Sequence, residues 1–156
     1  MSTTPAKRRE LAIGSLDEIV AEVERLAAGR VTTTGKHDFP SIVRHLAMTN
    51  NTTTGRMVAP KPPLFLRLLL PFIRSSILKG PVKPGIKLPP AAEAAFWPPE
   101  RISTTDAVSM LKDSVAYYKQ QGPLPVHPFF GKASREQIDR LICHHAAMHL
   151  SFVHPD

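Results

Sequence analysis

The sequence predicts an all-α protein, a four-helix bundle with an inserted proline-rich segment and a broken helix. Four stretches carry apolar residues at three- and four-residue steps, and each follows a serine or aspartate that can cap a helix. Its 156 residues suit one domain spanning residues 1–156. We expect a flexible tail over residues 1–14 and the proline-rich insertion over residues 60–99, between the second and third bundle helices.

The first two predicted helices begin at polar residues that can accept a backbone hydrogen bond. Ser15 precedes an amphipathic stretch, with Glu18 in the partner position of a capping box, and Gly29 follows the last apolar position. Asp38 is the expected cap of the second helix. The residues 50–55, rich in asparagine and threonine, favour turns and are expected to end that helix.

The insertion combines many prolines with the apolar run LFLRLLLPFI. We expect one helix over about residues 64–78, broken or kinked at Pro71. The run is too short for a membrane span of about 20 residues, and arginines interrupt it. Its apolar surface is expected, in order of preference, to cover the end of the bundle, to form a homodimer contact, or to lie on a membrane surface.

After this helix, the tract GPVKPGIKLPP is expected to be an extended connector, and Phe96 and Trp97 to anchor it against the core. Ser103, with Asp106 as its capping partner, is expected to begin the third bundle helix. Gly122 follows that helix and is expected to close it.

The last helix carries the residues most suggestive of chemistry. It is predicted over residues 134–152, with Ser134 and Gln137 as a capping box. His145 and His149 fall on its apolar stripe. Residues four apart on a helix are separated by about 40° and about 6 Å, so both rings can bind one metal ion at about 2.0–2.1 Å. HxxxH lacks the glutamate of the HExxH motif, so two buried, hydrogen-bonded rings remain the alternative.

Other histidines and the single cysteine are weighed by their positions. His45 lies at the edge of the buried face of the second helix and is the third candidate ligand. His144 is about 100° from its neighbour on the helix and should point away from the same metal. His127, between prolines in a loop, is expected to be a hydrogen-bonding residue. Cys143 is expected to be a small buried thiol.

Composition narrows the possible partners and compartment. The net charge of +7 can attract nucleic acid, anionic lipid or an acidic substrate. The basic residues are scattered and not interleaved with aromatic residues, which argues against nucleic-acid binding. The single cysteine excludes an internal disulfide, and no apolar leader precedes the first helix. A reducing cytoplasm is therefore the expected compartment.

The chain resembles the DinB-like superfamily of four-helix proteins, including a bacterial branch of unknown activity. The segments that carry the resemblance are SLDEIVAEVERL, FPSIVRHLA, GIKLPPAAEAAFWPPE, HPFFG and HHAAMHLSF. The resemblance implies a three-histidine site at His45, His145 and His149 that holds a divalent metal such as zinc, nickel or iron. Better-known relatives are thiol-dependent transferases or hydrolases, and several are homodimers.

These observations favour two functions over a third, a basic nucleic-acid or membrane-surface binder whose binding would weaken as salt rises. The first is a metal-dependent transferase or hydrolase that acts on a small molecule, with a low-molecular-weight thiol as a possible cofactor. Three neutral imidazoles would leave the metal a position open to water or substrate, as in catalytic sites. The alternative is a non-catalytic dimeric helical-bundle binding module without metal. No general acid or base is assigned, and Ser114, Tyr117 and Tyr118 are candidates by position alone.

Overall fold

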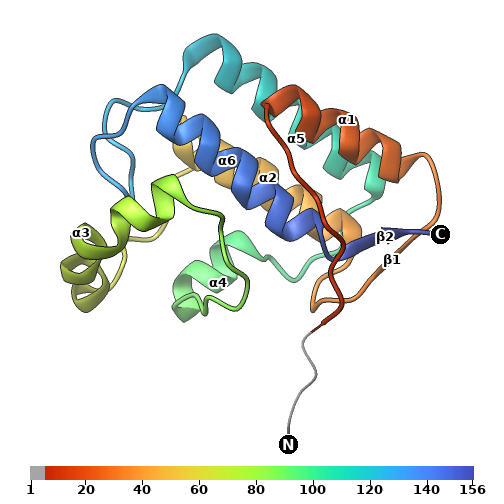
Figure 1. The fold of residues 1–156 in the computed structure, drawn as a ribbon, viewed down its shortest axis with the longest axis horizontal. Coiled ribbons are helices and arrows are strands. Elements are labelled where there is room, and N and C mark those ends of the chain that lie inside the picture. Colours follow the sequence, from red (N-terminus) through yellow and green to blue (C-terminus); the bar gives the residue numbers. More distant parts are fainter. Residues whose placement is uncertain (1–5) are drawn as a thin grey trace, which may run out of the picture.

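Four long helices form the body of the computed structural model, which describes residues 6–156 (Figure 1). Helix α1 packs against α5 and α6, and α2 packs against the same two helices, so the four enclose one apolar core. This arrangement confirms the predicted mostly helical fold. The bundle helices are α1 (Leu16–Ala27), α2 (Phe39–Thr53), α5 (Thr104–Gln121) and α6 (Arg135–Leu150).

All four predicted helix starts are observed. In each, the side-chain oxygen of the cap accepts a hydrogen bond from a backbone N–H three residues later, which typically stabilises a helix by about 1 kcal/mol. In the last of these helices the second bond of a capping box is also present, with the backbone N–H of Ser134 donating to the side-chain oxygen of Gln137. Glu18 instead accepts from the N–H of Gly14, one residue before the cap. The caps are Ser15, Asp38, Ser103 and Ser134.

Helix α2 continues through most of the asparagine- and threonine-rich run that was expected to end it. The hydroxyls of Thr52, Thr53 and Thr54 donate to carbonyls one turn back, at 3.0, 3.1 and 3.3 Å. Asn50 is buried and donates to the hydroxyl of Ser114 on α5 at 3.2 Å. The threonine hydroxyls thus bond within the helix itself and Asn50 bonds to α5, so these four side chains are accommodated without ending the helix.

The insertion contains two helices. Helix α3 (Leu64–Lys79) covers the predicted span and contains Pro71, so the helix does not end at the proline. The chain then runs without helix or strand to α4 (Pro90–Phe96), a short helix that the sequence did not predict. Helix α3 packs against α6 at the opposite end of the molecule from the sheet (Figure 1). No helix of residues 6–156 is long and apolar enough to cross a bilayer.

A small antiparallel sheet joins the end of the chain to the connection between α1 and α2. Strand β1 (Val31–Thr33) pairs with β2 (Val153–Pro155), with Thr32 opposite His154. All three residues of β1 are β-branched, and such residues favour extended backbone. No pattern in the sequence predicted this sheet.

The segment before α1 lies against the bundle. Residues 1–5 of the expected flexible tail fall outside the described residues. Residues 6–14 form no helix or strand, yet the N–H of Arg9 donates to the carbonyl of Ser151 at 2.9 Å and its side chain pairs with Glu22. Ile13 is buried in the core. These contacts lay the segment across α6 and α1.

Candidate metal centre

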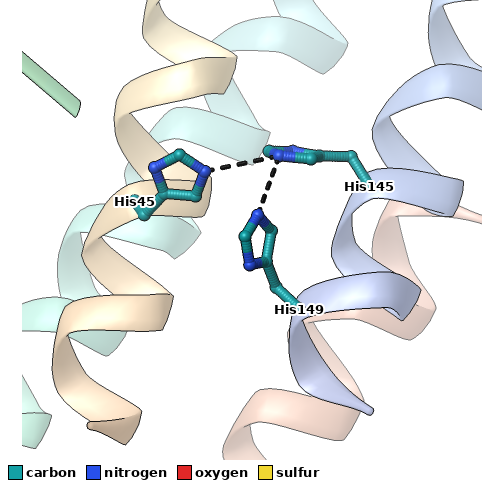
Figure 2. Close-up of side chains that lie close together, drawn as sticks. All are labelled: His45, His145 and His149. Carbon is teal, nitrogen blue, oxygen red and sulfur yellow. Dashed lines mark hydrogen bonds between the residues drawn. The ribbon is translucent and has the colours of Figure 1, made fainter. Parts of the chain in front are cut away.

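Three histidine side chains from two helices meet inside the bundle (Figure 2). Nε2 of His145 lies 3.3 Å from Nε2 of His45 and 3.1 Å from Nε2 of His149. Two metal–nitrogen bonds of about 2.0–2.1 Å at a tetrahedral angle place their nitrogens about 3.3 Å apart. Both distances to His145 match this spacing, and ligand atoms of all three rings lie within 4.8 Å of one another, so the three histidines could hold a common metal ion.

Helical periodicity explains how the rings come together. On α2, His45 is itself only 4% exposed, so it faces the interior of the bundle. On α6, four-residue spacing puts His145 and His149 one above the other, and α2 packs against α6. His45 and His145 are 100 residues apart in the sequence, and the packing of α2 against α6 brings them together.

A backbone carbonyl fixes the proton on one ring. Nδ1 of His45 lies 3.1 Å from the carbonyl oxygen of Phe96, at the end of α4. Because a carbonyl only accepts, the ring nitrogen must be the donor, which leaves the Nε2 lone pair of neutral His45 directed at the other two rings. Metal-binding histidines commonly have such a partner. The sequence could not reveal it, because a carbonyl belongs to every residue.

Trp97 lies beside the cluster. Its indole stacks on His45 with ring centroids 3.9 Å apart and on His37 with centroids 3.6 Å apart, both nearly parallel. At these distances the two imidazoles must occupy opposite faces of the indole. The ring of His149 meets Trp97 edge-on at 5.4 Å. Trp97 therefore covers one side of the cluster, and its predicted role as an anchor near Phe96 is confirmed.

Arg44, the neighbour of His45, holds the chain after Trp97 in place. Its guanidinium donates to the carbonyls of Pro98 at 2.6 Å and Glu100 at 2.8 Å. The side chain is buried, so both bonds are shielded from water. Arg44 thus fixes the loop that positions Trp97, and Trp97 covers the ring of the next residue, His45.

Burial keeps the three imidazoles uncharged at neutral pH. Loss of solvent lowers the pKa of His45 to about 3 and that of His145 to about 4. The pKa of His149 is also lowered far below its ordinary value, by burial and by the neighbouring histidines. The neutral form is the one that binds metals. His45 is buried, and His145 and His149 are half-buried.

His127 has a different role, as the sequence predicted. Its Nδ1 accepts from the backbone N–H groups of Phe129 at 3.1 Å and Phe130 at 3.3 Å. This fixes the proton on Nε2, which lies 3.3 Å from the hydroxyl of Thr53 and donates to it. Burial lowers the pKa of His127 to about 4. Both ring nitrogens are occupied, so His127 orders the loop before α6.

The neighbours of His145 are not part of the cluster. Nδ1 of His144 donates to the carbonyl of Gly80 at 2.7 Å, which ties α6 to the end of α3. Cys143 is buried, and burial raises the pKa of its thiol to about 11. Both findings confirm the predictions made from helix geometry.

The residues considered as acid or base by position have partners elsewhere. The hydroxyl of Tyr118 donates to Asp139, and Tyr117 lies under the guanidinium of Arg56. Ser114 is buried and donates to the carbonyl of Leu111. These contacts leave none of Ser114, Tyr117 and Tyr118 directed at the three histidines.

The family model for a protein of unknown function, DUF1569, matches residues 5–156. The chain belongs to the DUF1569 family. The match includes all three clustered histidines and the proline-rich insertion, so in this DUF1569 protein the insertion is part of the family domain. Comparisons with curated proteins and with solved structures gave no match.

Proposed function

We propose that this DUF1569 protein is a DinB-like metal-dependent enzyme, a transferase or hydrolase that acts on a small molecule. His45, His145 and His149 are the proposed ligands of a divalent ion such as zinc, nickel or iron. The observation that carries the proposal is the approach of three Nε2 atoms to 3.1 and 3.3 Å, with the proton of His45 held on its other nitrogen. The DinB-like assignment itself rests on the sequence resemblance.

The donor set fits a catalytic rather than a structural metal. Three neutral nitrogens leave the ion its full charge and a fourth position for water or substrate. When bound, the ion would act as a Lewis acid that lowers the pKa of water or of a thiol. His145 and His149 are half-buried rather than fully buried, and the proposal requires the fourth position to open on their side.

The chain's own residues would orient and shield the centre. The Phe96 carbonyl holds the tautomer of His45, and Trp97 excludes water from the face of that ring. A low-molecular-weight thiol would be the nucleophile of the transferase, and water that of the hydrolase. A homodimer in a reducing cytoplasm belongs to the same proposal, from the resemblance and the composition.

The experiment measures metal binding with matched histidine variants. Protein purified without an affinity tag is stripped with a chelator, then titrated with Zn²⁺, Ni²⁺ or Co²⁺, and bound metal is counted by mass spectrometry. Trp97, the single tryptophan, reports binding by its fluorescence, since it contacts two of the rings. We expect one ion per chain, lost in His145→Ala and His149→Ala and retained in His144→Ala.

The opposite result has a clear structural meaning. One N–H on His145 can be shared between the lone pairs of His45 and His149, so the three rings can satisfy one another without metal. Equal, near-zero metal in the wild type and in His145→Ala would identify this arrangement and support the non-catalytic dimeric module.

A second measurement separates the two proposed reactions. Cobalt has absorption bands that respond to the ligands around it. A strong sulfur-to-metal charge-transfer band after adding a small thiol to the Co²⁺ form would support the transferase. A spectrum insensitive to thiols, together with a titration of bound water near pH 7, would support the hydrolase.

A further inference from the structure

Helix α3 is apolar on two opposite faces. The inner face packs toward α6 and includes Leu78, which is buried, and Leu70 and Ile77, which are half-buried. The outer face is open to solvent, with Phe72 84%, Phe65 70% and Leu68 65% exposed. A helix that is apolar all round is normally covered on all sides. The outer face of α3 therefore calls for an occupant.

The segment that contains α3, residues 61–87, carries a charge almost equal to the net charge of the protein. Residues 39–92 contain no aspartate or glutamate, although the chain has 13 in total. Within residues 61–87 there are six basic residues, which nearly account for the net charge of +7. They are Lys61, Arg67, Arg74, Lys79, Lys83 and Lys87.

These cations are not neutralised within the described part of the chain. Over residues 6–156, no ion pair involves any of the six. Arg74 donates to the carbonyl of Phe130 at 2.6 Å, and this bond fastens α3 to the loop before α6. Beyond α3, the exposed Ile86 and Leu88 alternate with Lys83 and Lys87 in the connector. Apolar and basic groups thus share one surface at one end of the molecule.

We propose that this surface, the outer face of α3 together with residues 80–88, docks on an anionic membrane surface. Exposed leucine and phenylalanine on one side of a helix, flanked by lysine and arginine, suit insertion at the level of the lipid headgroups. Each basic residue close to such a surface contributes about 1 kcal/mol of attraction.

Charge also argues against a second copy as the occupant. A symmetric dimer through the outer face of α3 would bring the same basic segment of each chain close to its copy. Like charges brought together in this way are unfavourable. A dimer of this protein would therefore use another surface. The inference is independent of the metal centre, which lies on the faces of α2 and α6 that meet each other.

The test is co-sedimentation with vesicles of phosphatidylcholine alone and of phosphatidylcholine containing one third phosphatidylglycerol. We expect binding to the anionic vesicles only, weakening as salt rises. Phe72→Glu should reduce the partition coefficient roughly 10-fold or more, because an inserted ring is replaced by a like charge to the lipid. The matched control is Met110→Glu, on α5, which is also exposed and should bind as the wild type does.

Two double variants with the same change in net charge separate the effect of where the charges lie from the effect of the total charge. Lys83→Glu with Lys87→Glu should weaken binding roughly 30-fold or more, while Lys7→Glu with Arg101→Glu changes the net charge equally and should have little effect. Helical circular dichroism and Tm verify that each variant is folded. Absent binding of the wild type, or equal losses in both pairs, would overturn the proposal. So would a wild-type dimer that Phe72→Glu dissociates, without any vesicle binding.

Discussion

The buried histidines of this protein find partners for their ring nitrogens in two different ways. His127 has a backbone or hydroxyl partner on each ring nitrogen. In the cluster, the nitrogens of His45, His145 and His149 face one another. The first arrangement gives each ring nitrogen a separate partner, whereas the second brings ring nitrogens of three histidines together at one point. Burial alone therefore does not distinguish a structural histidine from a ligand, and the direction of the free lone pair does.

The largest expected effect is the loss of metal affinity when a clustered ring is removed. Binding free energies of about 10–16 kcal/mol for a four-ligand zinc site correspond to about 3–4 kcal/mol for each ligand. His145→Ala should therefore raise the metal Kd by roughly a hundred- to a thousandfold. Isothermal titration in the same buffer for the wild type and His144→Ala provides the comparison. A Kd unchanged within about threefold would contradict the assignment of His145.

Removal of His127 should lower the stability of the fold and leave the metal affinity almost unchanged. His127→Ala leaves the N–H groups of Phe129 and Phe130 without their acceptor and opens a gap in a buried loop, at a cost of about 2–3 kcal/mol in the free energy of unfolding. Urea denaturation of the metal-free protein measures this cost. The metal Kd of the same variant should stay within about twofold of the wild type. A large change in metal affinity would show that the two histidine groups are coupled.

These two expectations also indicate what the sequence could and could not provide. Helix starts at Ser15, Asp38, Ser103 and Ser134 were predictable because a cap is a local contact between neighbours in the chain. The pairing of His145 and His149 was predictable for the same reason, since helical geometry fixes it.

Features that depend on distant contacts were not predictable from local patterns. The Phe96 carbonyl that orients His45 is an example, because it carries no side-chain signal and reaches the site only through the folding of the insertion. The pairing of β1 with β2 likewise joins segments more than 100 residues apart. The persistence of α3 across Pro71 also runs against the local signal, since α3 keeps an inner face packed on α6.

The next effect is the pH dependence of stability. Burial lowers the pKa of His127 to about 4 from an ordinary value of 6.5, so between these values the unfolded chain binds more protons than the folded one. Stability contributed by His127 is therefore complete above about pH 6.5 and is lost as the pH falls toward 4. We expect the wild type to lose about 2 kcal/mol more than His127→Gln over this interval. Urea denaturation at pH 7.5, 5.5 and 4.5 with a chelator present makes the measurement, and parallel curves would contradict it.

The smallest expected effect concerns the group that covers the cluster. Trp97 touches His45 face to face and His149 edge-on, but it donates no ligand. Trp97→Leu keeps an apolar cover and loses the stacking contact, so the ring of His45 is held mainly by the Phe96 carbonyl. Changes to groups that orient metal ligands typically weaken binding by about 10- to 100-fold, and we expect the lower end, since the carbonyl contact remains. A competition assay with a coloured chelator measures this Kd without tryptophan fluorescence.

The control is His37→Ala, which frees the other face of the indole. It should change the metal Kd by less than about threefold, because His37 stacks on Trp97 and not on the three clustered rings. Equal effects of the two substitutions would mean that the whole stack, rather than the face of Trp97 next to His45, positions the site.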